Sequence, residues 1–284
     1  MAGLSVLPVL PSAPRLRLVD VGALSLGEGH DPYARLAAAV PCDILGFEPI
    51  AAECERLNRS ARPGCRYLPH AVGDGARHVF RQCNVPMTSS LFEPDAELLG
   101  MFHGLAEVTQ VVSREPVQTV RLDDIPEASG TDYLKLDVQG AELMVLQGAV
   151  RVLKDVLVIH TEVEFLPMYR EQPLFADVDA FLRGQGFLLH RLAGLKSASF
   201  RLPGVEAEIA GDVTQAMWAE AVYVRDFRVL DRLAPEALLK LAVILQENYG
   251  SADLAARVLA EHDRLAGTGY ADHFLQLILE AGAA

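Results

Sequence analysis

Apolar bursts alternate with stretches of helical spacing in the first part of the chain. Leu16 to Val21 forms the first burst, and Ile44 to Phe47 forms the second. Tyr33 to Val40 lies between them with the spacing of a helix, and Ile50 to Asn58 leads in the same way to a third burst, Tyr67 to Val72. This order is typical of right-handed βαβ units, which build a parallel sheet.

The same alternation resumes at residue 133. We expect strands over Tyr133 to Val138, Val156 to Val163, Phe187 to Leu192 and Ala219 to Val224. Two helical stretches lie among them, one marked by Leu143, Leu146, Val150 and Leu153 and the other by Leu174, Phe175, Val178, Phe181 and Leu182. The pattern therefore predicts an α/β fold, a doubly wound and mostly parallel sheet over residues 16–226.

Residues 75–125 interrupt this pattern. Short β-prone pieces, His78 to Gln82, Glu107 to Ser113 and Val117 to Leu122, surround a polar loop, Pro86 to Glu93. We expect an insertion or an edge hairpin that carries substrate contacts.

The two ends of the chain differ from the sheet domain. Residues 1–15 contain three prolines and no basic opening segment, so we expect an irregular entry and no signal peptide. Beyond a linker at 226–233, helices are expected over Pro235 to Asn248, Ala252 to His262 and Ala271 to Glu280, in which Leu238, Leu241, Ala242 and Leu245 are packing positions. Residues 227–284 therefore form a small α-helical appendage, which we expect to dock on the sheet domain or to mediate a homodimer.

Composition narrows the class of protein. The 38 acidic and 25 basic residues give a net charge of -13, which disfavours a nucleic-acid partner. No apolar run approaches the roughly 18 residues that span a bilayer, so membrane insertion is not expected. The four cysteines form no C-x-x-C pair, which favours reduced thiols in a cytoplasmic protein, with a disulfide as the alternative.

Acidic residues follow the first two predicted strands. Asp20 and Gly22 provide a carboxylate and an open turn, and Glu48 can accept hydrogen bonds from both hydroxyls of a ribose. Ligands of open parallel sheets bind at these strand ends, so the layout suits a nucleoside. The residues after Gly22 do not spell the dinucleotide motif G-x-G-x-x-G. The alternative is an ordinary turn glycine with solvated carboxylates.

Four segments together resemble the FkbM-type methyltransferases, a group of S-adenosylmethionine-dependent enzymes. The segments are Val19 to Ala23, Gly46 to Pro49, Val120 to Ile125 and Leu134 to Ala149, the last similar to the signature K-x-D-x-E-G-x-E-x-x-V-L-x-G-A. The resemblance covers about residues 16–192 and implies a class I, Rossmann-like methyltransferase sheet. Two departures are Gln139, where the family usually has Glu, and a long first loop, Leu24 to Tyr33.

The resemblance also implies roles for single residues. Asp20 and Gly22, with Ala23, would lie near the methionine part of S-adenosylmethionine, and Glu48, with Pro49, at its ribose. Ala71 and Val72 would flank the adenine, and Asp137 would lie near the sulfonium centre.

Further candidates lie near the acceptor side. His160, Glu162 and Glu164 alternate along one strand, so they are expected on one face, with His160 as a general base for a hydroxyl. The alternative is a structural histidine with structural carboxylates.

Two weaker hypotheses concern substrate and metal. Ser89 and Ser90 in the polar loop, together with Glu164, are candidate substrate contacts, although serine-rich loops are common without such a role. A divalent cation is a further hypothesis, held by Asp123, Asp137 and Glu162, because hard cations prefer oxygen ligands.

These observations predict methyl transfer from S-adenosylmethionine to a hydroxyl of a small-molecule or glycan acceptor, a sugar or another secondary metabolite. N-methylation is one alternative. The other is a nucleoside-binding or scaffold protein that has lost catalysis, which Gln139 and the long first loop leave open.

Overall fold

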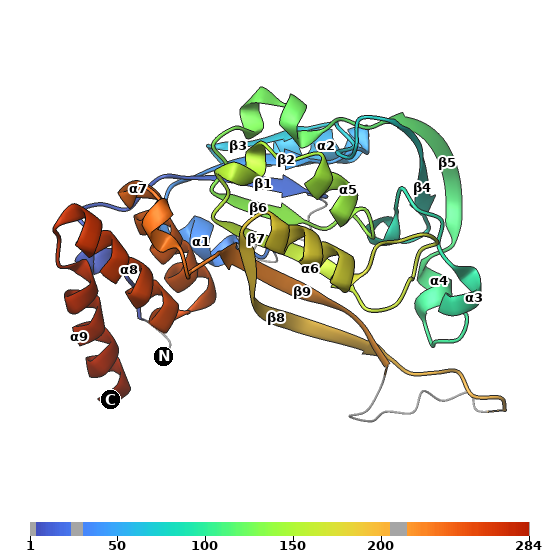
Figure 1. The fold of residues 1–284 in the computed structure, drawn as a ribbon. Helices are drawn as coiled ribbons and strands as arrows, with labels where there is room; N and C mark the ends of the chain where they lie inside the picture. The colour runs from blue at the N-terminus through green and yellow to red at the C-terminus, as the bar shows by residue number, and fades with distance from the viewer. Residues whose placement is uncertain (1–3, 24–30, 205–214, 284) are drawn as a thin grey trace.

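A computed structural model describes residues 4–23, 31–204 and 215–283. Its centre is a seven-stranded sheet of order β3-β2-β1-β6-β7-β9-β8 (Figure 1). The strands are β1 (Leu16–Val21), β2 (Cys42–Phe47), β3 (Cys65–Leu68), β6 (Tyr133–Leu136), β7 (Val158–Glu164), β8 (Phe187–Ala198) and β9 (Gln215–Arg225). The five strands from β3 to β7 run parallel, and β9 is antiparallel to both of its neighbours. The predicted fold class is confirmed.

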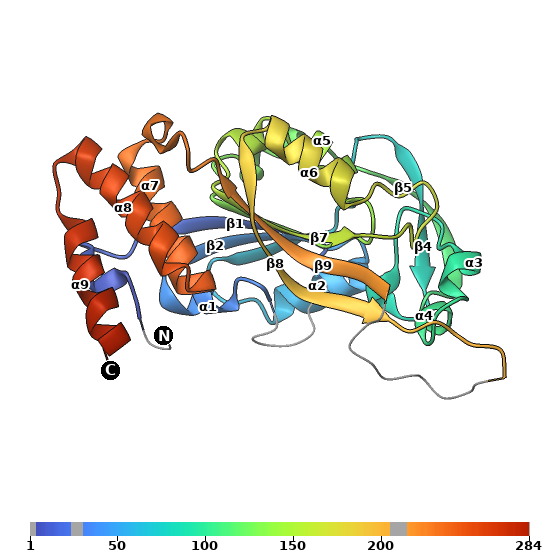
Figure 2. The same cartoon turned by 60° about the horizontal axis from the view of Figure 1, so that its bottom comes forward.

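Helices cover both faces of this sheet. In Figure 2, α5 (Glu142–Gln147) and α6 (Phe175–Gly184) lie above it, and α1 (Ala34–Ala39) and α2 (Ala51–Arg59) lie below it. The alternating side chains of the strands divide into two buried clusters, one on each face. Because the chain leaves β3 and returns to the other side of β1 as β6, the strand order reverses between β1 and β6. This reversal is the point at which ligands bind in open α/β sheets.

The interruption at residues 75–125 is a separate two-stranded antiparallel sheet. It pairs β4 (Arg77–Cys83) with β5 (Val111–Gln118). In the chain, two short helices, α3 (Ala96–Leu99) and α4 (Leu105–Val108), separate these two strands. The prediction of a strand over Glu107 to Ser113 is wrong in its first part. Thr109 donates from its Oγ1 to the Leu105 carbonyl at 2.8 Å, and this bond closes a helical turn where apolar residues had indicated a strand.

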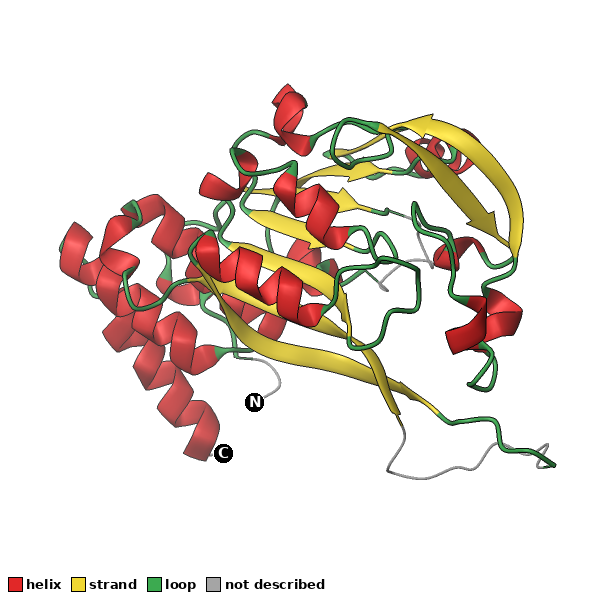
Figure 3. Ribbon diagram, turned by 45° about the vertical axis from the view of Figure 1, so that its right-hand side comes forward, coloured by secondary structure: helices red, strands yellow, loops and turns green. Residues whose placement is uncertain are grey.

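The C-terminal helices pack on the lower face of the sheet. They are α7 (Pro235–Val243), which continues as a π-helical segment (Ile244–Asn248), then α8 (Ala252–Ala266) and α9 (Tyr270–Ala283). Their buried residues, Leu238 and Leu241 among them, share one cluster with β1, β6 and α1. The N-terminal segment is held there too, because Gln246 donates to the Leu4 carbonyl at 2.8 Å. Figure 3 shows the long β8–β9 pair reaching away from these helices.

Two expectations from composition meet the structure here. Among the residues that the structure describes, no helix has the length and apolar character needed to cross a bilayer. Cys42, Cys54, Cys65 and Cys83 are all free thiols.

Burial on α7 generates a stability prediction. Leu241 is 1% exposed inside the shared cluster, and Leu279 on α9 is 72% exposed. Leu241→Ala should lower the free energy of unfolding by about 2 to 5 kcal/mol, because it leaves a cavity between helix and sheet. The matched Leu279→Ala should change it by no more than about 0.5 kcal/mol. Equal losses for the two variants in urea unfolding would show that α7 is not part of the core.

Candidate active site

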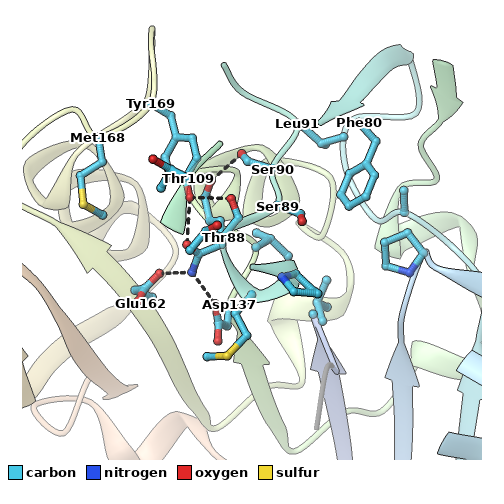
Figure 4. A pocket seen from close by; sticks show the side chains of 18 of the residues that line it. Phe80, Thr88, Ser89, Ser90, Leu91, Thr109, Asp137, Glu162, Met168 and Tyr169 are labelled. Atoms are coloured by element: carbon cyan, nitrogen blue, oxygen red, sulfur yellow. Dashed lines mark hydrogen bonds between the residues drawn. The ribbon is translucent and has the colours of Figure 1, made fainter. Parts of the chain in front are cut away.

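A cavity of about 540 Å³ lies beyond the carboxyl ends of the parallel strands. Figure 4 shows part of its lining, with side chains from β4, from the loop after it and from the ends of β6 and β7. Of the residues predicted from the sequence, the cavity is lined by Gly22, Glu48, Pro49, Ala71, Val72, Ser89, Ser90, Asp137 and Glu162. Asp20, Ala23, His160 and Glu164 are not among the described residues that line it.

The turn after β1 is tightly packed against the end of β6. Gly22 has φ +79°, and a Cβ on it would lie 1.9 Å from the Asp137 carbonyl oxygen. A side chain at this position would therefore force the two strand ends apart. Glycine is required here by contact as well as by backbone conformation.

Buried Lys135 on β6 supports this turn from below. Its Nζ donates to the Gly22 carbonyl at 2.7 Å and lies 3.1 Å from Asp20 Oδ1. Burial alone would lower the pKa of Lys135, but Asp20 and Asp137 raise it above its ordinary value. Tyr33 donates to the other Asp20 oxygen at 2.7 Å. Asp20 therefore anchors the sheet beneath the cavity, outside its lining, because its strand parity points it at Lys135.

The remaining residues of the first predicted loop add little. Ala23 is buried, and its backbone N–H donates to the Phe47 carbonyl at 3.0 Å. Residues 24–30 of the long loop lie outside the described residues.

Glu48 lies at the end of β2 as predicted. Its Oε1 accepts the backbone N–H of Ile50 at 2.8 Å, which fixes the carboxylate against the start of α2. Burial raises the pKa of Glu48. Each carboxylate oxygen has two lone pairs, so the group can still accept hydrogen bonds from a ligand in the cavity.

Gln139 links Asp137, which follows β6, to Glu162, which lies near the end of β7. Its Nε2 donates to Asp137 Oδ1 at 3.0 Å and to Glu162 Oε2 at 2.7 Å, as Figure 4 shows. Tyr169 donates from its hydroxyl to Gln139 Oε1 at 3.0 Å. Gln139 has φ +54°, an uncommon value that places its side chain between the strand ends. The sequence indicated Gln139 only as a departure from the family's Glu, and Tyr169 carried no signal.

The polar loop forms one lip of the cavity and is fastened to this arrangement. Ser90 donates from its Oγ to the Gln139 carbonyl at 2.6 Å, and Tyr169 is 2.9 Å from the Thr88 carbonyl. Ser89 lines the cavity beside them.

His160 is buried on the side of the C-terminal helices. Its Nδ1 lies 3.1 Å from the Tyr249 hydroxyl, and its Nε2 lies 3.1 Å from Glu220 Oε2. The two rings stack with centroids 6.0 Å apart. Glu220 lines the cavity, so His160 contacts a lining residue without lining the cavity itself. The expectation that His160 and Glu162 face the acceptor side together is not met, because Tyr249, distant in sequence, holds the imidazole.

Glu164 belongs to a buried group of carboxylates under the turn between β6 and α5. Glu142 accepts the N–H groups of Val138 and Gly140 at 2.8 and 2.9 Å. Oxygens of Glu142, Glu162 and Glu164 lie within 4.8 Å of one another. Burial raises the pKa of all three, that of Glu142 to about 7. A bound proton can therefore relieve their repulsion.

The carboxylates predicted to hold a divalent cation do not meet. Asp123 accepts the backbone N–H groups of Arg151 and Val152 at 2.9 and 3.0 Å. Asp137 and Glu162 line the cavity, and Asp123 is not among the described residues that do so. The hypothesis of an Asp123, Asp137 and Glu162 site is therefore wrong.

Solved structures show distant similarity. A presumed methyltransferase from Thermoplasma acidophilum has 8% sequence identity and a TM-score of 0.36, with 75% of this chain and 69% of that chain covered. The N-terminal domain of EvdMO1 with SAH bound has 13% identity and a TM-score of 0.34, with 77% and 76% covered. LepI in complex with SAM has 11% identity and a TM-score of 0.30, with 78% and 46% covered.

The comparison with protein families is decisive. None of the curated protein sequences matches this chain. The model of the methyltransferase FkbM domain matches residues 20–189, which is more than half of the chain. Apart from Val19, this range includes all four segments that carry the predicted resemblance. The predicted resemblance is confirmed, and the chain belongs to the FkbM family of methyltransferases.

Proposed function

We propose that the protein transfers a methyl group from S-adenosylmethionine to a hydroxyl oxygen of a small molecule, a sugar or another secondary metabolite. The observation that carries this proposal is the continuous cavity that joins Glu48 at one strand end to Asp137 and Glu162 at two others. Membership of the methyltransferase family supports the reaction type. The choice of oxygen rests on the carboxylates, because a hydroxyl needs a base and a neutral amine needs less assistance.

The cavity residues fit the cofactor. Glu48 would accept the ribose hydroxyls, with its carboxylate already fixed by Ile50. Ala71 and Val72 offer an apolar wall for the adenine, and the close turn at Gly22 leaves room for the methionine part. When bound, S-adenosylmethionine supplies a methyl group on a positively charged sulfur and becomes S-adenosylhomocysteine once the acceptor oxygen has taken that methyl. Asp137 provides negative charge that favours such a cation, and Glu162 adds to it when ionised.

Glu162 is the better candidate for the base. It lines the cavity, and Gln139 fixes one of its oxygens at 2.7 Å. Burial and the neighbouring Asp137 raise the pKa of Glu162, so its ionised form is a stronger base than an ordinary carboxylate. In this proposal the proton of the acceptor hydroxyl passes to the Glu162 carboxylate. His160 is a positioning residue that orients Glu220.

Removal of Glu48 tests the cofactor site. Glu48→Ala should weaken S-adenosylmethionine binding by about 1.5 to 3 kcal/mol in calorimetry, the worth of hydrogen bonds to a charged group. Glu55→Ala, on the exposed side of α2, is the matched control and should bind normally. Unchanged affinity in Glu48→Ala would remove the ribose role.

Removal of the charge at Glu162 tests the chemistry. Glu162→Gln should lower kcat roughly 10² to 10⁴-fold on a hydroxyl acceptor while cofactor affinity changes little. The reaction needs ionised Glu162, so the wild-type rate should fall as pH falls through its raised pKa, and the variant should lose this dependence. His160→Ala should have a smaller effect, because it acts through Glu220.

Assays of the protein with a set of alcohols and amines decide between O-methylation, N-methylation and a scaffold without catalysis. Near-normal turnover by Glu162→Gln would contradict its role as the base. Transfer to amines with none to alcohols would favour N-methylation, and cofactor binding with no transfer to either would favour a scaffold.

Metal dependence has its own test. Asp123 is held by the backbone N–H groups of Arg151 and Val152 and is not among the described residues that line the cavity, so the three predicted ligands do not come together there. Treatment with EDTA should therefore leave the methyl-transfer rate unchanged. Loss of activity that returns with added Mg²⁺ would show instead that a cation takes part.

A further inference from the structure

A third apolar cluster forms part of the cavity wall. Its buried members are Leu99, Phe102, Met168, Tyr169, Ala198 and Met217, and Leu105 and Trp218 pack against it. This cluster is distinct from the two that cover the faces of the sheet. It is assembled from the insertion, the loop after β7 and the ends of β8 and β9.

The cavity takes much of its wall from this cluster and from the insertion beside it. The apolar lining residues of this region are Phe80, Met87, Leu91, Leu99, Leu105, Val108, Met168 and Trp218. Figure 4 shows Phe80 and Leu91 on one side of the view and Met168 on the other, with the hydroxyl-bearing residues between them. Whatever binds there meets hydrocarbon or aromatic surface from several directions.

Four hydroxyl groups in this wall are already engaged within the protein. Ser90 donates to the Gln139 carbonyl at 2.6 Å, and Thr109 donates to the Leu105 carbonyl at 2.8 Å. Thr88 Oγ1 lies 2.8 Å from the Val108 carbonyl oxygen, and Tyr169 bonds to Gln139 and Thr88. A hydroxyl has one hydrogen to donate, so these four offer a ligand no further donor.

The other polar groups of the wall are engaged in part. The Gln139 amide donates to both carboxylates. Ser89 Oγ accepts the backbone N–H of Cys83 at 3.0 Å and keeps its own hydrogen to donate, and exposed Lys196 also lines the cavity. The wall is mostly apolar, and among the hydroxyl, amide and ammonium groups of its described side chains the Ser89 hydroxyl and the Lys196 ammonium are the donors left to a ligand. A ring with several hydroxyls would give up its bonds to water and find too few partners, and burial of polar groups without partners is unfavourable.

One place in this region is suited to a protic group. The carboxylates of Asp137 and Glu162 line the cavity where the strand ends meet, and a carboxylate accepts a hydrogen bond without needing a donor of its own. From these contacts we infer that the acceptor has a neutral, apolar body and presents one protic group to Asp137 and Glu162. This inference rests on the proposed function and narrows its acceptor from sugars to lipophilic alcohols or phenols.

A neutral fluorescent probe tests the wall without requiring catalysis. N-phenyl-1-naphthylamine should bind the full chain saturably, and 2-naphthol should displace it while methyl glucoside at the same concentration should not. Met87→Glu puts a charge into the wall and should weaken probe binding about tenfold. Met101→Glu is the matched control, because both methionines are 46% exposed and Met101 does not line the described cavity.

The outcomes separate this inference from the function on which it rests. Displacement by methyl glucoside as effective as that by 2-naphthol, or equal probe affinity in the two variants, would overturn the apolar acceptor. Efficient methyl transfer to a polyhydroxylated sugar would also overturn it and leave the methyltransferase proposal standing. If the wild-type protein binds the probe but shows no S-adenosylmethionine binding in calorimetry, that result would count against the proposed function alone.

Discussion

Buried Lys135 on β6 contacts both β1 and the turn after β1, and the geometry of the site depends on these contacts. Lys135 neutralises Asp20 and donates to the Gly22 carbonyl, so one cation fixes both the core of β1 and the turn that follows it. Without it Asp20 would be a buried charge whose remaining partner among the described side chains is Tyr33, which is costly inside a sheet. The approach of Gly22 to the Asp137 carbonyl depends on the same alignment of β1 and β6. The cavity floor is therefore a consequence of a structural ion pair, and Asp20 supports the site without lining it.

The C-terminal helices contribute to the same region from below. Tyr249, at the end of the π-helical segment, bonds to Tyr133 on β6 and to His160 on β7. Asn248 donates to the Pro32 carbonyl at 2.9 Å, next to Tyr33, whose hydroxyl binds Asp20. The helical part thus shares a hydrogen-bonded layer with the strands that carry the cavity.

The predictions that succeeded rest on local patterns. Alternating apolar bursts and helical spacing identified the strands of the sheet. The rule that ligands meet strand ends placed Glu48, Asp137 and Glu162 at the cavity, and their roles stay predictions. Strand parity alone could not place His160, because its surroundings depend on Tyr249, 89 residues away. Asp123 was misplaced since its partners, the N–H groups of residues 151 and 152, follow from tertiary packing. The roles of Gln139 and Tyr169 depend on a positive φ and on a loop contact that no periodic pattern records.

The engaged hydroxyls of the cavity wall also affect how water occupies it. Water at a surface with few free donors is held weakly, so an apolar ligand can displace it at low cost. Binding to such a wall carries a negative change in heat capacity and is often driven by enthalpy near room temperature. Weakly held water is also poorly placed to compete as a nucleophile for an activated group. In the proposed function, the hydrogen bonds of Ser90, Thr109 and Tyr169 would thus limit solvent chemistry as well as ligand choice.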